Sequence, residues 1–137
     1  MPDLNDFNRK IVDEFRANAG KVGGPFEGAA MILLTTKGAK SGQERLAPLV
    51  YQADGDRYII FASKAGAPTS PDWYHNLVAH PQATAEVGTE KFAVVARVAE
   101  GEERDRLWTT QKAQSPQFAE YETKTTRTIP VVVLERA

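Results

Sequence analysis

The spacing of hydrophobic positions predicts an amphipathic helix at the start of the chain. Apolar residues recur there at helical intervals: Leu4, Phe7, Ile11 and Phe15. Asp3 can cap the first turn, and charged residues fill the opposite face. We expect a helix within residues 1–19 that packs on a core. A helix lying on a membrane surface is the alternative, which its mixed charge signs disfavour. A glycine-rich loop, residues 20–28, follows it.

Short apolar runs, rich in β-branched and aromatic residues, predict strands further along the chain. There are six such runs: residues 31–36, 46–51, 57–62, 83–87, 91–98 and 129–134. Residues 53–56, Ala-Asp-Gly-Asp, predict a hairpin between the second and third runs. Pro48 lies inside the second run and cannot donate to a ladder. We therefore expect an edge, a bulge or a ligand-facing position there.

Helical patterns separate some of these strands. Ser-Pro-Asp at 70–72 predicts a helix start, with serine as N-cap and proline at the first helical position, before residues 73–79. A charged helix is expected over 102–114, and a short helical turn after 115. Hairpin-linked strands without alternating βαβ units predict an α+β fold, an antiparallel barrel with packed helices. At 137 residues, we expect residues 1–137 to form one domain.

Glycines and cations gather between the first two strands. Residues 37–45 are Lys-Gly-Ala-Lys-Ser-Gly-Gln-Glu-Arg. Gly38 and Gly42 permit close backbone approach, and cations beside free N–H groups can hold a phosphate or carboxylate. The sequence therefore indicates a turn that grips an anionic ligand. A merely soluble hairpin turn is the alternative, because lysine and serine are common in turns.

Composition narrows the classes of function. The net charge of −1 gives no general attraction to nucleic acid, so we expect no nucleic-acid partner and a local anion site. The chain has no cysteine, which excludes disulfides and thiolate chemistry. No signal peptide and no apolar run of spanning length is evident, so a cytoplasmic location is expected.

Known catalytic patterns are missing. The two histidines, His75 and His80, have no further ligands at metal-site spacing, so no metal site is expected. No Gly-x-Ser-x-Gly motif is present. Lys40-Ser41-Gly42 leads into a strand, which disagrees with a Walker A loop. Since no side chain here carries out redox chemistry, an oxidoreductase would need a borrowed cofactor.

Candidate ligand-binding residues lie on several separate segments. They are the turn with Lys40 and Arg45, the strand end at Ser63-Lys64, the helix start at 73–76, and Tyr121. The aromatic residues Trp73 and Tyr74 either pack in a core or stack on a flat ring. His75 is expected to line a pocket or to pack on Trp73.

Several of these segments together match a family pattern. The matching blocks, in chain order, are Thr35-Thr-Lys-Gly-Ala-Lys-Ser-Gly42, Arg45, Pro48-Leu49, Ala62-Ser63, Gly66-Ala67-Pro68, Trp73-Tyr-His-Asn76, His80-Pro81, Tyr121-Glu-Thr-Lys-Thr125, Arg127 and Ile129-Pro-Val131. In these blocks the sequence resembles the deazaflavin-dependent nitroreductase family, split-barrel proteins that use coenzyme F420. The resemblance extends over roughly residues 29 to 134.

The resemblance implies a split β-barrel and reduced F420 as hydride donor, with a quinone, an enone or a nitro compound as acceptor. It implies cofactor contacts for Ala39, Lys40, Ser41, Arg45, Leu46, Ala47, Pro48, Leu49, Val50, Phe61, Ala62, Ser63, Lys64, Asp72, Trp73, Tyr74, His75, Asn76 and Tyr121. Tyr121 and Ser63 are the candidates for orienting the acceptor or supplying a proton. The resemblance also implies weak membrane contact by the first helix, and related barrels often form homodimers.

One position departs from the family pattern. Some members carry a second tyrosine three residues before the one that matches Tyr121, and this chain has Phe118 there. The missing phenol argues against activity on bicyclic nitroimidazoles. Two alternatives stay open from the sequence: a split-barrel oxidoreductase that uses FMN, and a non-catalytic F420 carrier.

Overall fold

The computed structural model describes residues 6–23, 30–63, 71–125 and 128–137. The chain forms helices and strands in this order: α1 (Asp6–Ala17), β1 (Met31–Lys37), β2 (Glu44–Val50), β3 (Gln52–Asp54), β4 (Arg57–Phe61), α2 (Asp72–Ala79), β5 (Gln82–Val87), β6 (Glu90–Val98), α3 (Gly101–Gln114), α4 (Gln117–Lys124) and β7 (Val131–Arg136).

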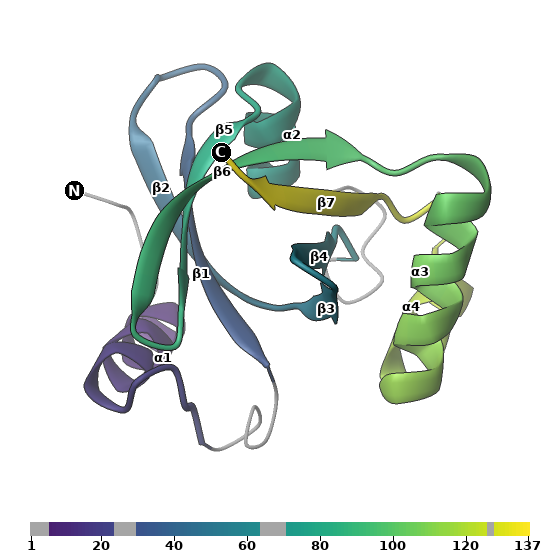
Figure 1. Cartoon of the computed structure of the whole chain (residues 1–137), viewed down its shortest axis with the longest axis horizontal. Helices are drawn as coiled ribbons and strands as arrows, with labels where there is room; N and C mark the ends of the chain where they lie inside the picture. Colours follow the sequence, from purple (N-terminus) through teal and green to yellow (C-terminus); the bar gives the residue numbers. More distant parts are fainter. Residues whose placement is uncertain (1–5, 24–29, 64–70, 126–127) are drawn as a thin grey trace.

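The described strands form one curled antiparallel sheet of seven strands (Figure 1). Their order is β2-β1-β5-β6-β7-β4-β3, and every neighbouring pair is antiparallel. The two edge strands, β2 and β3, follow one another in the chain with only Tyr51 between them. The sheet must curl for the chain to pass so directly between its edges. The α+β class and the antiparallel sheet predicted from the sequence are thus confirmed.

Two details of the predicted elements were wrong. The second strand does not run unbroken to Tyr51, because β2 ends at Val50 and pairs with β1, whereas β3 pairs with β4. The helix α2 has Pro71 as its N-cap, one residue after the expected Ser70, which lies outside the described residues. Pro71 has an extended backbone (ψ 159°), so helical geometry begins only at Asp72.

Two other local predictions are confirmed. Pro48 lies on β2, an edge strand, opposite Leu33 of β1, where a missing N–H costs no ladder hydrogen bond. The predicted hairpin joins β3 to β4, with Asp54 opposite Arg57 and Gly55 at φ 61°. Glycine suits this left-handed position in a two-residue loop.

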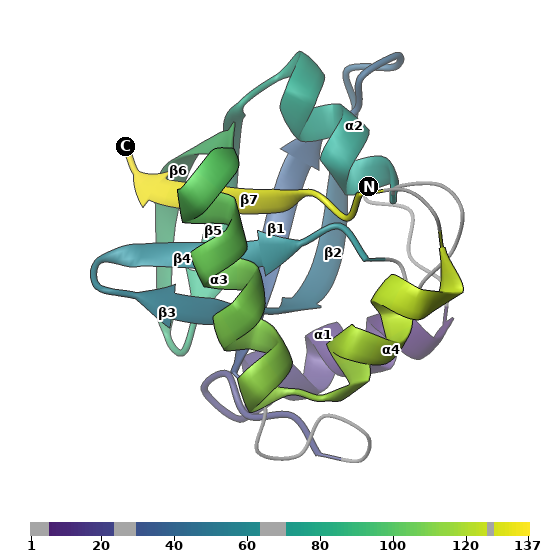
Figure 2. The same cartoon turned by 90° about the vertical axis from the view of Figure 1, so that its right-hand side faces the viewer.

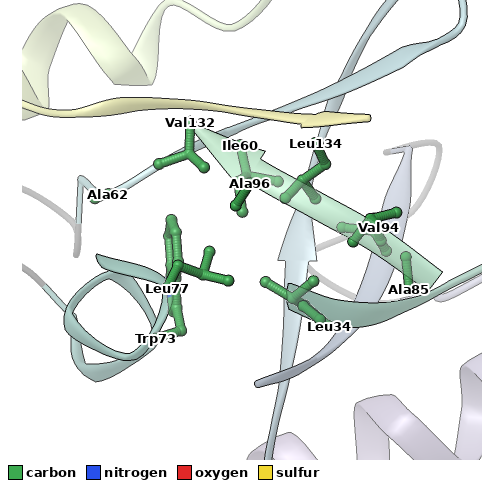
Figure 3. Close-up of a cluster of buried hydrophobic side chains, with 12 residues drawn as sticks. Leu34, Ile60, Ala62, Trp73, Leu77, Ala85, Val94, Ala96, Val132 and Leu134 are labelled. Atoms are coloured by element: carbon green, nitrogen blue, oxygen red, sulfur yellow. The ribbon is translucent and has the colours of Figure 1, made fainter. Parts of the chain in front are cut away.

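The sheet buries apolar side chains on both faces, because its strands alternate. On the inner face, Trp73 and Leu77 of α2 face strand residues such as Leu34, Ile60 and Val132 (Figure 3). This cluster fills the curl. Trp73 is 8% exposed, so its core interpretation is confirmed, although its edge still reaches the surface.

The outer face carries two further clusters. One joins α3 and α4 to β4 and β7, through residues such as Trp108 and Phe61. The other joins α1 to β1 and β2, through Ile11 and Phe15. Figure 2 shows α3 crossing in front of the sheet, while Figure 1 shows α1 far from α3 and α4. The fold therefore packs α2 against the inner cluster and the other helices against the two outer clusters.

An ion-pair cluster ties α3 to the β3–β4 hairpin. Glu103 of α3 pairs with Arg57 (2.9 Å) and with Arg97 of β6 (2.6 Å). Asp54 pairs with Arg57 and with Arg106 of α3 (3.2 Å). Four charged groups from the hairpin and α3 thus alternate in sign, with Arg97 extending the cluster onto β6.

The apolar face of α1 is already occupied by the fold. Ile11, Val12 and Phe15 are 6%, 3% and 1% exposed. These side chains would have to leave the core before they could enter a lipid surface. In the described part of the chain, no helix combines the length and the apolar character needed to cross a bilayer.

Candidate functional site

A surface hollow lies between the β1–β2 turn and α2. Both cartoon views place this turn beside α2 (Figures 1 and 2). The hollow has a volume of about 810 Å³, within the range of small-molecule sites. Its described lining residues are Asn8, Thr36, Gly38, Ala39, Lys40, Ser41, Arg45, Leu46, Ala47, Asp72, Trp73, His75 and Asn76.

Hydrogen bonds within the β1–β2 turn fix its shape. The Gly38 N–H donates to the Gln43 carbonyl (2.8 Å), and the Gly42 N–H donates to the Gly38 carbonyl (2.9 Å). The Ser41 hydroxyl accepts from the Gln43 N–H (3.2 Å). Gly42 adopts φ 71°, which glycine does at no steric cost. The serine hydroxyl therefore already has a role inside the turn.

The turn leaves no room for a side chain at Gly38. A Cβ on Gly38 would lie 2.7 Å from the Ser41 Oγ and 3.2 Å from the Gln43 carbonyl oxygen. Within the described residues, the backbone N–H groups of Lys40 and Ser41 form no hydrogen bond. Both residues are exposed, so these groups can donate to an anion.

One buried side chain connects the turn to α2. The Asn76 Oδ1 accepts from the Ala39 N–H (3.0 Å), and the Asn76 Nδ2 donates to the Thr36 Oγ1 (3.1 Å). Asn76 is 6% exposed and Thr36 1% exposed. The carboxamide thus bonds both the end of β1 and the turn that follows it.

The charges of the hollow favour an anionic ligand. Lys40 is exposed and Arg45 is half-buried, and both line the hollow. Asp72 contributes a carboxylate to the same lining, which can only accept hydrogen bonds when it is ionised. Two cations beside unpaired N–H groups fit a phosphate or a carboxylate. The residues present thus suit a cofactor that carries such groups.

More than half of the predicted cofactor residues come together in this hollow. The lining includes the predicted residues Ala39, Lys40, Ser41, Arg45, Leu46, Ala47, Asp72, Trp73, His75 and Asn76. His75 lines the hollow as expected, but its ring contacts Tyr74 at a 5.5 Å centroid distance and not Trp73. Lys64 lies outside the described residues.

Other predicted cofactor residues are not among the lining residues described. Pro48, Leu49 and Val50 continue β2 beyond the hollow, and Tyr74 packs against the inner core. Ala62 is fully buried in the same core. Their proposed cofactor contacts stay predictions.

Tyr121 and Ser63, the predicted catalytic residues, are also not among the described lining. Tyr121 lies on α4, where its ring contacts Phe118 at 5.2 Å. The Phe118 ring in turn contacts the Phe61 ring at a centroid distance of 5.7 Å. Tyr121 and Phe118 are thus part of the outer cluster that includes Trp108 of α3. Ser63 is buried just after β4. Their roles in catalysis likewise stay predictions.

Sequence reasoning missed three lining residues: Asn8, Thr36 and Gly38. Thr36 and Gly38 lie inside the motif that carried the family resemblance, so the motif itself offered the signal. Asn8 comes from α1, where its polar position looks like any solvated helix face. Only the packing of α1 against β1 and β2 brings it to the hollow.

Comparison with known proteins shows the family of this chain. Residues 7–136 match the family model described as F420H(2)-dependent quinone reductase. The chain belongs to this family. It is 42% identical over 126 residues to a protein named F420H(2)-dependent quinone reductase from Mycobacterium tuberculosis, covering 89% of this chain and 85% of that one. The deazaflavin cofactor of the family resemblance is thus confirmed, whereas the nitroreductase label is not what the matched family carries.

Solved structures support the fold of this quinone reductase family member. A structure titled F420-H2 Dependent Reductase (FDR-A) has a TM-score of 0.71 and 41% identity, covering 77% of this chain and 94% of that chain. A structure described as a domain-swapped dimer has a TM-score of 0.74 and 36% identity, covering 95% and 98%. These matches confirm the predicted split-barrel fold.

Proposed function

We propose that this chain is an F420H2-dependent reductase whose acceptor is a quinone. The proposal is supported by one hollow that brings together Lys40, Arg45 and turn N–H groups that have no partner among the described residues. The chain also matches the F420H(2)-dependent quinone reductase family over residues 7–136. When bound, reduced F420 supplies the hydride. The quinone takes up this hydride and one proton, and leaves as the hydroquinone.

The chain's own contribution is to bind and orient. Lys40 and Arg45 would hold the anionic groups of the cofactor, and the N–H groups of Lys40 and Ser41 would add hydrogen bonds. Leu46, Ala47 and the edge of Trp73 offer an apolar wall that excludes water from part of the hollow. Positioning of this kind accounts for a large share of catalysis in two-reactant reactions.

We also propose that Tyr121 and Ser63 orient the acceptor or supply the proton, directly or through water. Tyr121→Phe removes only the phenol oxygen, and its ring contact with Phe118 should survive. We expect kcat to fall by a larger factor than the cofactor Kd rises. An unchanged kcat in this variant would remove Tyr121 from the mechanism.

The deciding experiment titrates oxidised and reduced F420 into purified protein, then adds menadione and follows cofactor fluorescence. We expect saturable binding and menadione-dependent oxidation of the reduced cofactor. Binding without turnover over a panel of quinones, enones and nitro compounds would instead indicate a carrier. A tightly bound yellow cofactor in the purified protein would indicate FMN.

Assembly and domain organisation are further parts of the proposal. We propose that residues 1–137 act as one cofactor-binding domain, because all three apolar clusters share strands of the one sheet. We propose a homodimer, supported by the neighbour described as a domain-swapped dimer. Light scattering on the purified chain tests whether it is a dimer.

Membrane contact by α1 would require release of its buried face. Vesicle sedimentation tests for such contact.

A further inference from the structure

The side chain of Asn76 bonds α2 to the β1–β2 turn. Its Oδ1 accepts from the backbone of Ala39, and its Nδ2 donates to the side chain of Thr36. One carboxamide on a helix thus bonds both the end of a strand and the turn that follows it. The same loop carries Lys40, the next residue after Ala39.

Both residues of the Asn76–Thr36 pair are buried. Asn76 is 6% exposed and Thr36 is 1% exposed. Both polar atoms of the carboxamide have partners in the protein. An unpaired amide is costly at such a buried position, so these bonds are expected to persist. The Ala39 N–H is also taken, and this leaves the N–H groups of Lys40 and Ser41 for a ligand.

The Asn76 bonds hold a turn whose glycines give its backbone conformational freedom. Glycines occupy positions 38 and 42, and glycine is the residue with most backbone freedom. The hydrogen bonds within the turn join its residues only to each other. The bond from Ala39 to Asn76 fixes the turn to a helix that is anchored in the inner core by Trp73 and Leu77.

We propose that Asn76 is a positioning residue, which holds the cation-bearing turn in its binding shape against α2 rather than contacting the cofactor through its amide. We call the two hydrogen bonds of the Asn76 side chain the clamp. The clamp rests on the geometry alone, whereas its link to F420 rests on the proposed function. It changes the predicted roles of Asn76 and Ala39 from ligand contacts to supports of Lys40. A preformed turn loses less conformational freedom on binding.

The clamp can be tested without any cofactor. The Ala39 amide should exchange slowly with solvent in the free protein, because it is bonded to Asn76. Asn76→Leu keeps the approximate size and removes both bonds, so the Ala39 amide should exchange at least tenfold faster. Asn76→Asp keeps an acceptor for that N–H and should retain protection. Val78→Ala, an exposed site on the same helix, is the matched control and should change nothing.

The link to binding is tested by F420 fluorescence titration. We expect Asn76→Leu to raise the F420 Kd about tenfold. Lys40→Ala should cost less affinity in the Asn76→Leu background than in the wild type, because Lys40 is then no longer held in place. If Asn76→Leu unfolds, Thr36→Val removes one of the two bonds and should give a smaller change in the same direction.

Each outcome decides a separate point. An Ala39 amide that is unprotected in the wild type, or equally protected in Asn76→Leu, overturns the clamp. Lost protection with an unchanged Kd, or additive effects of the two substitutions, overturns the link between clamp and binding. A wild-type protein that shows the clamp but does not bind F420 overturns the proposed function and leaves the clamp intact.

Discussion

Two glycines allow the end of α1 to approach the β5–β6 turn. Gly20 has φ 93°, and a Cβ on it would lie 2.7 Å from the Gly88 Cα. Gly88 itself has φ 59°. The backbones of these two residues are therefore in close contact.

Gly20→Ala should consequently destabilise the protein strongly. The substitution adds left-handed strain of about 1–2 kcal/mol and a backbone clash. Gly55→Ala is the matched control, because Gly55 has φ 61° but no atom within 4 Å of the place that a new methyl group would take. Urea unfolding should show a larger loss at Gly20 than at Gly55. Equal losses would mean that the close approach contributes nothing.

Lys40 is the residue whose charge the proposed function depends on most directly. Lys40→Ala should raise the F420 Kd about tenfold, which corresponds to about 1.4 kcal/mol. Because Lys40 is exposed, added salt should reduce the difference. Lys91→Ala removes the same charge from β6, outside the hollow, and should leave the Kd unchanged. An equal effect of both substitutions would point to net charge rather than to a site.

At the scale of elements, α3 is held to the β3–β4 hairpin by paired charges. Hydrogen bonds from Arg106 and Arg57 lower the pKa of Asp54 to about 2. Hydrogen bonds from Arg97 and Arg57 lower the pKa of Glu103 to about 2. Both carboxyls therefore bind protons less readily in the folded chain than in the unfolded one.

This difference gives stability a definite dependence on pH. A lowered folded-state pKa contributes stability above the unfolded pKa, near 3.8 for Asp54 and 4.5 for Glu103, and the contribution is lost as the pH falls to about 2. Asp54→Asn with Glu103→Gln should be less stable than wild type at pH 7. Urea unfolding should show the two converging near pH 2.

The size of this effect is limited by solvent, since the pairs are partly exposed and salt screens them. Glu102→Gln changes an exposed neighbour on α3 that forms no ion pair among the described residues, and serves as control. A constant gap between wild type and the double variant from pH 7 to pH 2 would contradict the pairing.

The elements differ in how well the sequence predicted them. Most strands and helices followed from local patterns, such as the Asp-Gly hairpin and the apolar runs. The break at Tyr51 could not be predicted, because it depends on which partner strand each half finds. In the same way, Lys40 and Arg45 were predictable from one continuous turn. The contribution of Asn8 and the bonds of Asn76 arise only from tertiary packing.

At the scale of the whole molecule, one sheet supports clusters on both of its faces. Leu34 of β1 is fully buried on the inner face, beside Trp73 and Leu77 (Figure 3). Leu34→Ala should lower the free energy of unfolding by about 2–5 kcal/mol, the usual cost of such a cavity. Val95→Ala, at a 42% exposed site on β6, should cost about 0.5 kcal/mol or less.

The same unfolding curves test whether the chain is one domain. Because β1, β4 and β7 contribute to clusters on both faces, loss of the inner cluster should unfold α1, α3 and α4 as well. We expect one transition that coincides by tryptophan fluorescence and by circular dichroism. Two separated transitions would show that the outer helices and the sheet unfold independently.

The connection through Tyr51 limits how far apart the two edges of the curled sheet can lie. Opposite margins of a seven-strand ribbon are joined by a single amino acid, which spans only about 3.5 Å. A spacer of several glycines inserted after Tyr51 would slacken that junction, and the ribbon would then be free to flatten. Homologues with a longer connection here can be expected to enclose a wider interior.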